Sequence, residues 1–294
     1  MKYTGLDDKV VMAVIYIFLT LAMLIVAVPL LYIVSASFSS PHMVTTGKVF
    51  LWPREPTLMG YEAVFKNGQI LTGFMNSFIY MFAGTAVNLF MTTLAAYPLS
   101  RQRFFGKNVL SIIFIIPMFF SGGLVPLYLV VKNLALLNTR ASMIIPAAMS
   151  VWNVILMRTF IQSTIPGEMY EASQIDGCDD FRFLLRIVLP LSAPILAVLA
   201  LYCGVGLWNS YFSALIYLKS QSLFPLQIIL RNILVLNNLN PEMIKDFESL
   251  ARKQGIADLL KYSCIVVASA PVMLIYPFVQ RYFVKGVMIG AVKG

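Results

Sequence analysis

The chain has 294 residues, of which 59% are apolar and only 12% are charged, and its mean hydropathy is +0.81. Soluble domains carry about 25% charged residues, so this composition excludes an ordinary soluble protein. Its long apolar segments predict an all-α integral membrane protein, because lipid requires every backbone polar group to be bonded within the chain. The net charge of +9 comes from Lys and Arg scattered near the ends of apolar segments. This scatter favours contact with membrane lipid and argues against nucleic acid as a partner.

Apolar segments along the chain predict six transmembrane helices, with a short head before the first and a polar loop after it. Proline and glycine residues predict a break in the third span and a bend at the start of the fifth. An amphipathic stretch follows the fifth span, and a long polar loop at about 219–261 precedes the sixth. The chain is thus divided into an anchor span with its outer loop (1–69), a core of five spans (70–279) and a tail (280–294). The spans are expected at residues 10–34, 70–97, 109–131, 141–157, 187–207 and 262–279.

The charged residues indicate that the chain has no driving force of its own. Every Asp, Glu, Lys and Arg lies in a loop or within a turn or two of a span end, whereas ion-driven transporters place such residues at depth. A phosphate-binding GxxxxGK[ST] motif is missing, since Gly106-Lys107 is followed by Asn108. The three scattered cysteines and single histidine predict neither a disulfide framework nor a metal site. A transporter of this kind must take its energy from a partner, and a non-transporting scaffold or intramembrane enzyme is the disfavoured alternative.

One acidic segment lies between the fourth and fifth spans. Pro166 and Gly177 frame a short helix predicted at about 166–177, and Asp180 is expected to cap a second helix. The segment is either a solvated loop helix or a rigid knob that meets a partner protein. Two capped helices in succession at the end of a span favour the knob. Five acids without any intervening Lys or Arg occupy this segment: Glu168, Glu171, Asp176, Asp179 and Asp180.

Residues 165–194, IPGEMYEASQIDGCDDFRFLLRIVLPLSAP, resemble the EAA loop of inner-membrane permease subunits of binding-protein-dependent ABC importers, in the form found in sugar importers. Ser173 departs from the pattern, because alanine is usual there. Asn76-Ser77, Ala95-Ala96-Tyr97 before Arg101, Trp208-Asn209 and the VKG of the tail extend the resemblance over most of the chain. The whole is similar to the smaller permease of a maltose-type heterodimer. The matching loop positions are Glu171-Ala172, Asp176-Gly177, Ile187, Leu189-Pro190-Leu191 and Pro194.

This resemblance implies the type I ABC importer permease fold, in which the acidic knob is a coupling helix seated on a cytoplasmic ATPase. The implied partners are a homologous second permease, two ATPase subunits and an extracytoplasmic solute-binding protein, with ATP and Mg bound by the ATPases and no cofactor in this chain. The implied location is a bacterial inner membrane with both termini cytoplasmic, which the density of Lys and Arg near the ends also favours. The implied solute is a sugar or oligosaccharide; a peptide or polyol is the alternative. The expected coupling positions are Glu168, Glu171, Ala172, Ser173, Asp176 and Gly177.

A polar stripe in the second span is the candidate solute path. Asn76, Tyr80, Gly84, Asn88 and Thr92 recur every four residues and therefore share one helix face. Helix packing through small and hydrogen-bonding residues explains such a stripe equally well. Aromatic and amide side chains suit sugar rings, although Trp208 and Tyr211 are also typical of interfacial anchors. The path candidates are Asn76, Tyr80, Asn88, Asn153, Trp208, Asn209 and Tyr211, with Trp152 beside Asn153.

Overall fold

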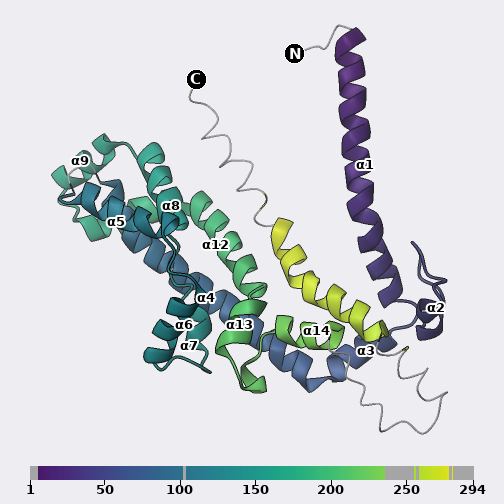
Figure 1. Ribbon diagram of the computed structural model, residues 1–294. Helices are drawn as coiled ribbons and strands as arrows, with labels where there is room; N and C mark the ends of the chain where they lie inside the picture. The colour runs from purple at the N-terminus through teal and green to yellow at the C-terminus, as the bar shows by residue number, and fades with distance from the viewer. Residues whose placement is uncertain (1–5, 102–103, 236–254, 256–257, 278–279, 281–294) are drawn as a thin grey trace. The chain divides into compact units, whose positions relative to one another are not determined.

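The computed structural model describes residues 6–101, 104–235, 255, 258–277 and 280 (Figure 1). Over these ranges the chain is helical and contains no β-strand. Its contacts divide it into two compact units. Unit 1 holds the described residues of Met1–Gly68 and Leu230–Ala270, and unit 2 holds those of Gln69–Ile229 and Pro271–Gly294.

Three helices in the described ranges are long and apolar enough to cross a membrane, at Asp8–Ser37, Gly68–Ser100 and Asp258–Pro277. The first belongs to α1 (Leu6–Ser37) and the second is α4 (Gly68–Ser100). Two further spans arise if each bent helix pair counts as one, which raises the total to as many as five. The predicted first, second and sixth spans are confirmed as helices, although residues 278–279 and 281–294 lie outside the described ranges.

Both predicted interruptions are confirmed. The third span consists of α5 (Lys107–Phe119) and α6 (Leu124–Asn133), which are bent by 115° at the glycine-containing break. The fifth begins with a π-helical turn at Leu184–Val188 and the short α11 (Leu189–Leu191), and it then bends by 76° into α12 (Ala193–Trp208). Prolines lie within three residues on either side of each break, Pro117 and Pro126 at the first and Pro190 and Pro194 at the second, where the missing N–H and the ring weaken the helical hydrogen bonds.

The predicted fourth span at 141–157 is wrong as one continuous helix. The chain forms the short α7 (Ala141–Ile144), leaves the helix around Pro146, and resumes in α8 (Val151–Thr164). Arg158, which was expected to close the span, lies inside α8. Its Nη1 donates a hydrogen bond to Ser111 Oγ of α5 at 3.2 Å, and the helix continues beyond it to Thr164.

The two loops predicted to be polar contain helices. Residues 35–69 include α2 (Pro41–Thr45) and α3 (Met59–Lys66). After α13 (Tyr211–Tyr217), the expected loop at 219–261 contains α14 (Leu226–Val235), whose Leu226, Ile228, Ile229 and Leu230 are buried. Apolar residues at helical spacing produce this buried face, and they account for the correction.

Unit 1 is held together at the C-terminal end of α1. The hydroxyls of Ser37 and Tyr61 are 2.8 Å apart, and the rings of Tyr32 and Tyr262 meet edge to face at 5.7 Å. In contrast, the Asp8–Ser37 helix has none of its most apolar window buried within this chain. That surface is suited to lipid or to another protein.

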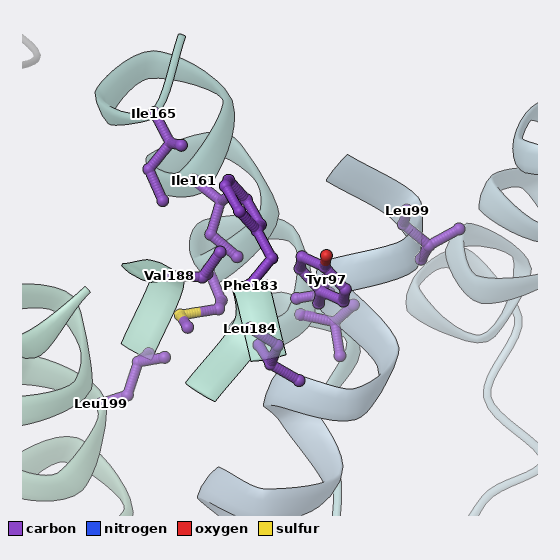
Figure 2. Close-up of a cluster of buried hydrophobic side chains, with 11 residues drawn as sticks. Tyr97, Leu99, Ile161, Ile165, Phe183, Leu184, Val188 and Leu199 are labelled. Carbon is purple, nitrogen blue, oxygen red and sulfur yellow. The ribbon is translucent and has the colours of Figure 1, made fainter. Parts of the chain in front are cut away.

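Unit 2 has a hydrophobic core where the C-terminal part of α4 meets α8, α10 (Asp180–Phe183) and the π-helical turn (Figure 2). Phe183 and Val188 are fully buried there, so the region after the acidic helix is packed into the core rather than suspended in a loop. Figure 1 shows α4 running from the part of unit 2 that carries α13 to the part that carries α9 (Gly167–Ile175). The core residues are Ala96, Tyr97, Leu99, Val154, Met157, Ile161, Ile165, Phe183, Leu184, Val188 and Leu199.

Candidate functional site

The acidic segment forms the predicted helix α9, and its end has a defined cap. Asp176 follows the last helical residue, and Gly177 adopts φ +74°, a conformation that L side chains rarely take. The Gly177 N–H donates to the Gln174 carbonyl at 3.0 Å, and the Cys178 N–H donates to the Ser173 carbonyl at 2.9 Å. These two bonds make a Schellman motif. The prediction that Gly177 ends the helix through a left-handed turn is confirmed.

The capping residue of the second helix is Asp179, not Asp180 as the sequence predicted. Asp179 Oδ1 accepts a hydrogen bond from the Arg182 N–H at 2.7 Å, and α10 begins at the next residue. Asp180 is the first residue of α10 and does not cap it. Its Oδ1 accepts a hydrogen bond from Tyr170 Oη of α9 at 2.8 Å. Asp179 therefore caps α10, while Asp180 binds a side chain of α9.

Most of α9 is accessible. Ile175 is 87% exposed, Met169 is 39% exposed, and Phe181 of α10 is 66% exposed. Ser173 is the exception, because it is 7% exposed and its hydroxyl donates to the Tyr170 carbonyl at 2.7 Å. A small side chain is therefore required at this inward position, which serine satisfies as alanine would. The remaining predicted coupling positions are all exposed: Glu168, Glu171, Ala172, Asp176 and Gly177.

A cation–aromatic cluster, here called the Arg101 cluster, joins α9 and α10 to the end of α4. It consists of Tyr97, Arg101, Tyr170, Asp180 and Phe183. The guanidinium carbon lies 3.3 Å from the Tyr170 ring centroid, 5.1 Å from that of Phe183 and 5.7 Å from that of Tyr97. Tyr97 Oη donates to the backbone oxygen of Asp180 at 3.1 Å and to its Oδ1 at 3.3 Å. Sequence reasoning missed this cluster.

The hydrogen bond to Asp180 stabilises the protonated form of the Tyr170 hydroxyl. This bond raises the pKa of Tyr170 above the usual tyrosine value, and burial and the Asp180 charge raise it further, while Arg101 lowers it. The hydroxyl therefore remains a donor throughout the physiological pH range.

The first half of the polar stripe fastens the 220–226 segment to α4. Asn76 Nδ2 donates to the carbonyls of Ser222 at 2.8 Å and Phe224 at 3.1 Å, and its Oδ1 accepts from Arg140 Nη2 at 3.4 Å. Tyr80 Oη donates to the Leu223 carbonyl at 2.7 Å. Both side chains are buried, at 1% and 0% exposed. These contacts give both residues a packing role in this chain.

The second half of the stripe forms a buried amide network across α4, α8 and α12. Asn88 Nδ2 donates to the Ala147 carbonyl at 2.8 Å. Asn88 Oδ1 accepts from Asn153 Nδ2 at 3.2 Å, Cys203 Sγ at 3.1 Å and Thr92 Oγ1 at 3.3 Å. One amide thereby joins three helices. A role of Asn88 and Asn153 in the solute path stays a prediction, whereas their packing contacts are present in the structure.

The remaining path candidates divide between buried and exposed positions. Trp208 is 1% exposed, and its ring packs edge to face on Phe74 at 5.8 Å and Phe78 at 5.1 Å. Asn209 and Tyr211 follow α12 and are exposed, Tyr211 at 37%. The structure thus leaves these two residues available to a solute or a partner. Among the described residues, no group of three or more His, Cys, Asp and Glu side chains is arranged to hold a metal ion.

Comparison with known proteins agrees with this architecture. Residues 89–289 match the family described as binding-protein-dependent transport system inner membrane component. Protein LplC of Bacillus subtilis (strain 168) is 39% identical over 273 residues, which cover 92% of this chain and 90% of that protein. The polygalacturonan/rhamnogalacturonan transport system permease protein YtcP of the same organism is 36% identical over 281 residues, covering 95% of this chain and 97% of that protein.

A solved structure extends the match to three dimensions. A chain in the crystal structure of a bacterial ABC transporter involved in the import of the acidic polysaccharide alginate has a TM-score of 0.89 to this chain. The two chains are 31% identical, and the match covers 96% of this chain and all of the other. In such importers the membrane subunit works with a solute-binding protein and a separate ATPase. The chain therefore belongs to the family of inner-membrane components of binding-protein-dependent transport systems, and it is a permease subunit of an ABC importer without an ATPase site of its own.

Proposed function

We propose that this chain is one of two homologous permease subunits that together import an oligosaccharide across a bacterial inner membrane. The observation that carries this proposal is its similarity, over nearly its full length, to a polygalacturonan/rhamnogalacturonan transport permease and to a chain of an alginate importer. Two ATPase subunits and an extracytoplasmic solute-binding protein complete the assembly. Fragments of acidic polysaccharides are the first substrates to test.

The helix α9 is the docking element for an ATPase subunit in this proposal. Its exposed acids can pair with basic groups, and exposed Met169 and Ile175 can enter an apolar groove. The Schellman motif after Ile175 fixes where the helix ends, so α9 meets its partner as a rigid body. This docking places α9 and both termini in the cytoplasm.

The solute path, in turn, lies along the surfaces that this permease presents to its homologue. Asn209 and Tyr211 are the candidates with exposed side chains. We assign direct solute contact to these two. The buried Asn76, Tyr80, Asn88, Asn153 and Trp208 shape the path by fixing the helices that line it.

Transport by the reconstituted complex tests the substrate class. The two permeases, the ATPase and the binding protein are placed in proteoliposomes, and ATP-dependent uptake of labelled oligogalacturonides, arabino-oligosaccharides, a dipeptide and a polyol is measured. Saturable uptake of an oligosaccharide that requires both ATP and the binding protein is expected. Uptake of the dipeptide or the polyol, with no oligosaccharide transported, contradicts the assignment.

Labelling of α9 tests the orientation separately. A cysteine in place of the exposed Ile175 is introduced into a variant that lacks Cys178, Cys203 and Cys264, since Cys178 is itself partly exposed. A membrane-impermeant maleimide is expected to label inverted vesicles and not right-side-out vesicles. Labelling from the outside contradicts cytoplasmic docking, whatever the substrate.

A further inference from the structure

The Arg101 cluster joins α9 and α10, which follow one another in sequence, to the end of α4, which lies far from them in sequence. Tyr97 comes from α4, Arg101 follows α4 directly, Tyr170 comes from α9, and Asp180 and Phe183 belong to α10. The Asp180 carboxylate accepts hydrogen bonds from both tyrosines, while the guanidinium lies over the ring of Tyr170. Neither function assigned above, docking or solute contact, uses these groups.

The geometry of the cluster fixes orientation as well as distance. A planar guanidinium at 3.3 Å from a ring centroid restricts the tilt of that ring. Tyr170 also meets Phe183 edge to face at 5.2 Å, and its hydroxyl is bonded to Asp180. The Tyr170 ring is therefore restrained by Arg101 over its face, by the edge-to-face contact with Phe183, and by the bond from its hydroxyl to Asp180. Since Tyr170 lies in the middle of α9, the whole helix is oriented with respect to α4.

The rest of α4 is equally well attached to the remainder of unit 2. This 33-residue helix carries the Asn88 network, which reaches α8 and α12, and then Asn76 and Tyr80, which hold the 220–226 segment. Hydrogen bonds at several points along its length restrain α4 from moving separately from α8, α12 and the 220–226 segment. A tilt imposed on α9 is thus passed to the helices that line the proposed path.

We propose that Arg101, Tyr97, Tyr170 and Asp180 are positioning residues that couple α9 to α4, so that movement of the ATPase is transmitted to the membrane helices. This inference rests on the proposed docking of α9. Without the cluster, α9 still docks through its exposed surface, but its movement is absorbed by rotation about the loops on either side. ATP is then hydrolysed without solute import.

The test separates docking from transmission in the assembled complex. A photo-crosslinking amino acid at Ile175, which is 87% exposed on α9, reports docking on the ATPase. Uptake and ATP hydrolysis are measured in proteoliposomes with the binding protein. For Arg101→Ala, cross-linking is expected to persist, whereas the ATP hydrolysed per solute imported rises by about fivefold or more. Arg182→Ala is the matched control, because this exposed arginine of α10 forms a 3.7 Å surface pair with Asp179 and is outside the cluster.

A second set of variants preserves all the aromatic rings. Tyr97→Phe and Tyr170→Phe each remove one of two donors to Asp180, and the double variant removes both. Because one donor still satisfies the carboxylate, the double variant is expected to uncouple by more than the product of the single effects. Multiplicative or smaller effects overturn the shared-acceptor arrangement.

The outcomes distinguish this inference from the proposed function. Absence of the cross-link in the unaltered complex contradicts docking itself. A normal cross-link with an unchanged hydrolysis-to-uptake ratio in Arg101→Ala and in the double tyrosine variant overturns the positioning role and leaves docking intact. Loss of the cross-link in the double tyrosine variant shows that the cluster only folds the loop, and this also overturns the inference.

Discussion

The two ends of α4 make polar contacts of different kinds. At its C-terminal end the Arg101 cluster supports α9, whose acids remain on the surface. Toward its N-terminal end, Asn76 and Tyr80 are buried and bonded to backbone carbonyls of the 220–226 segment. The C-terminal end of α4 therefore supports a helix whose acidic side chains are exposed. The N-terminal part uses neutral polar side chains to bind another segment of the same chain.

This difference separates polar residues that have hydrogen-bond partners inside the chain from the exposed acids that the proposed function assigns to a partner. Buried polar groups must find hydrogen bonds inside the chain, so Asn76, Tyr80 and Asn88 are explained by their internal partners. Exposed acids on a capped helix have no such requirement. The contrast is open to direct test, because α9 variants should impair transport with little loss of stability, whereas stripe variants should lose stability first.

The largest expected effect is that of Gly177→Pro. Proline cannot adopt φ +74°, and it removes the N–H that donates to the Gln174 carbonyl at 3.0 Å. The end of α9 must then rearrange, at a local cost of roughly 3 kcal/mol. Uptake in proteoliposomes is expected to fall by more than about tenfold.

Gly167→Ala is the matched control for this change. Gly167 lies in the first turn of the same helix, and a Cβ there meets no atom within 4 Å. Uptake by this variant is expected to equal that of the unaltered complex. Full uptake by Gly177→Pro contradicts the role of the capped helix, because the two glycines then behave alike.

The second expected effect is a loss of stability in Asn88→Leu. Leucine removes the donor to the Ala147 carbonyl and the acceptor shared by Asn153, Cys203 and Thr92. Several buried groups lose a partner, so the free energy of unfolding in an SDS titration is expected to fall by about 1–3 kcal/mol. The exposed Asn209→Leu serves as control and is expected to change it by less than about 0.5 kcal/mol. Equal losses contradict the contrast between buried and exposed amides.

The acidic helix was predictable because its determinants are local. Pro166, Gly177 and the run of acids lie within a few turns of one another, and the predicted α9 and its left-handed end are observed. The Arg101 cluster was not predictable, since Tyr97 and Asp180 are 83 residues apart and no local pattern pairs them. A visible hint was the arginine placed one turn after Tyr97.

Two errors in the predicted elements have a related cause. The sequence predicts a polar loop where α14 (Leu226–Val235) forms, because the apolar face of this helix is short. Its first turn is covered only once Asn76, Ser77 and Tyr80 hold it and the preceding segment on α4. The sequence pattern does not distinguish Asp179 from Asp180 as a cap, because either acid can precede the second helix. In the structure Asp179 accepts from the Arg182 N–H, whereas Asp180 accepts from Tyr170 Oη of α9, a tertiary contact that no local pattern predicts.

A smaller effect on transport is expected from Glu168→Lys. Glu168 is exposed in the first turn of α9, where an acid interacts favourably with the helix dipole by about 0.3–1 kcal/mol. Global stability should therefore change little, while reversal of the charge on the docking surface lowers uptake by about fivefold. Glu62→Lys is the matched control, since Glu62 is an exposed first-turn acid of α3 that pairs with Lys66. Similar uptake by both variants contradicts a specific role for the α9 surface.

The smallest expected effect is that of Tyr80→Phe, which keeps the ring and removes the bond from Tyr80 Oη to the Leu223 carbonyl. The loss is about 1 kcal/mol, so exchange of the neighbouring Leu226 amide is expected to quicken by about fivefold in a hydrogen–deuterium exchange measurement. That amide donates to Ser77 Oγ at 2.9 Å and reports whether the segment stays on α4. Tyr202→Phe, at a tyrosine that is 70% exposed, is the control and should leave the exchange unchanged. Unchanged exchange in Tyr80→Phe would instead mean that Asn76 is sufficient to hold the segment. The Tyr80 hydroxyl would then not be needed for packing and could bond a solute.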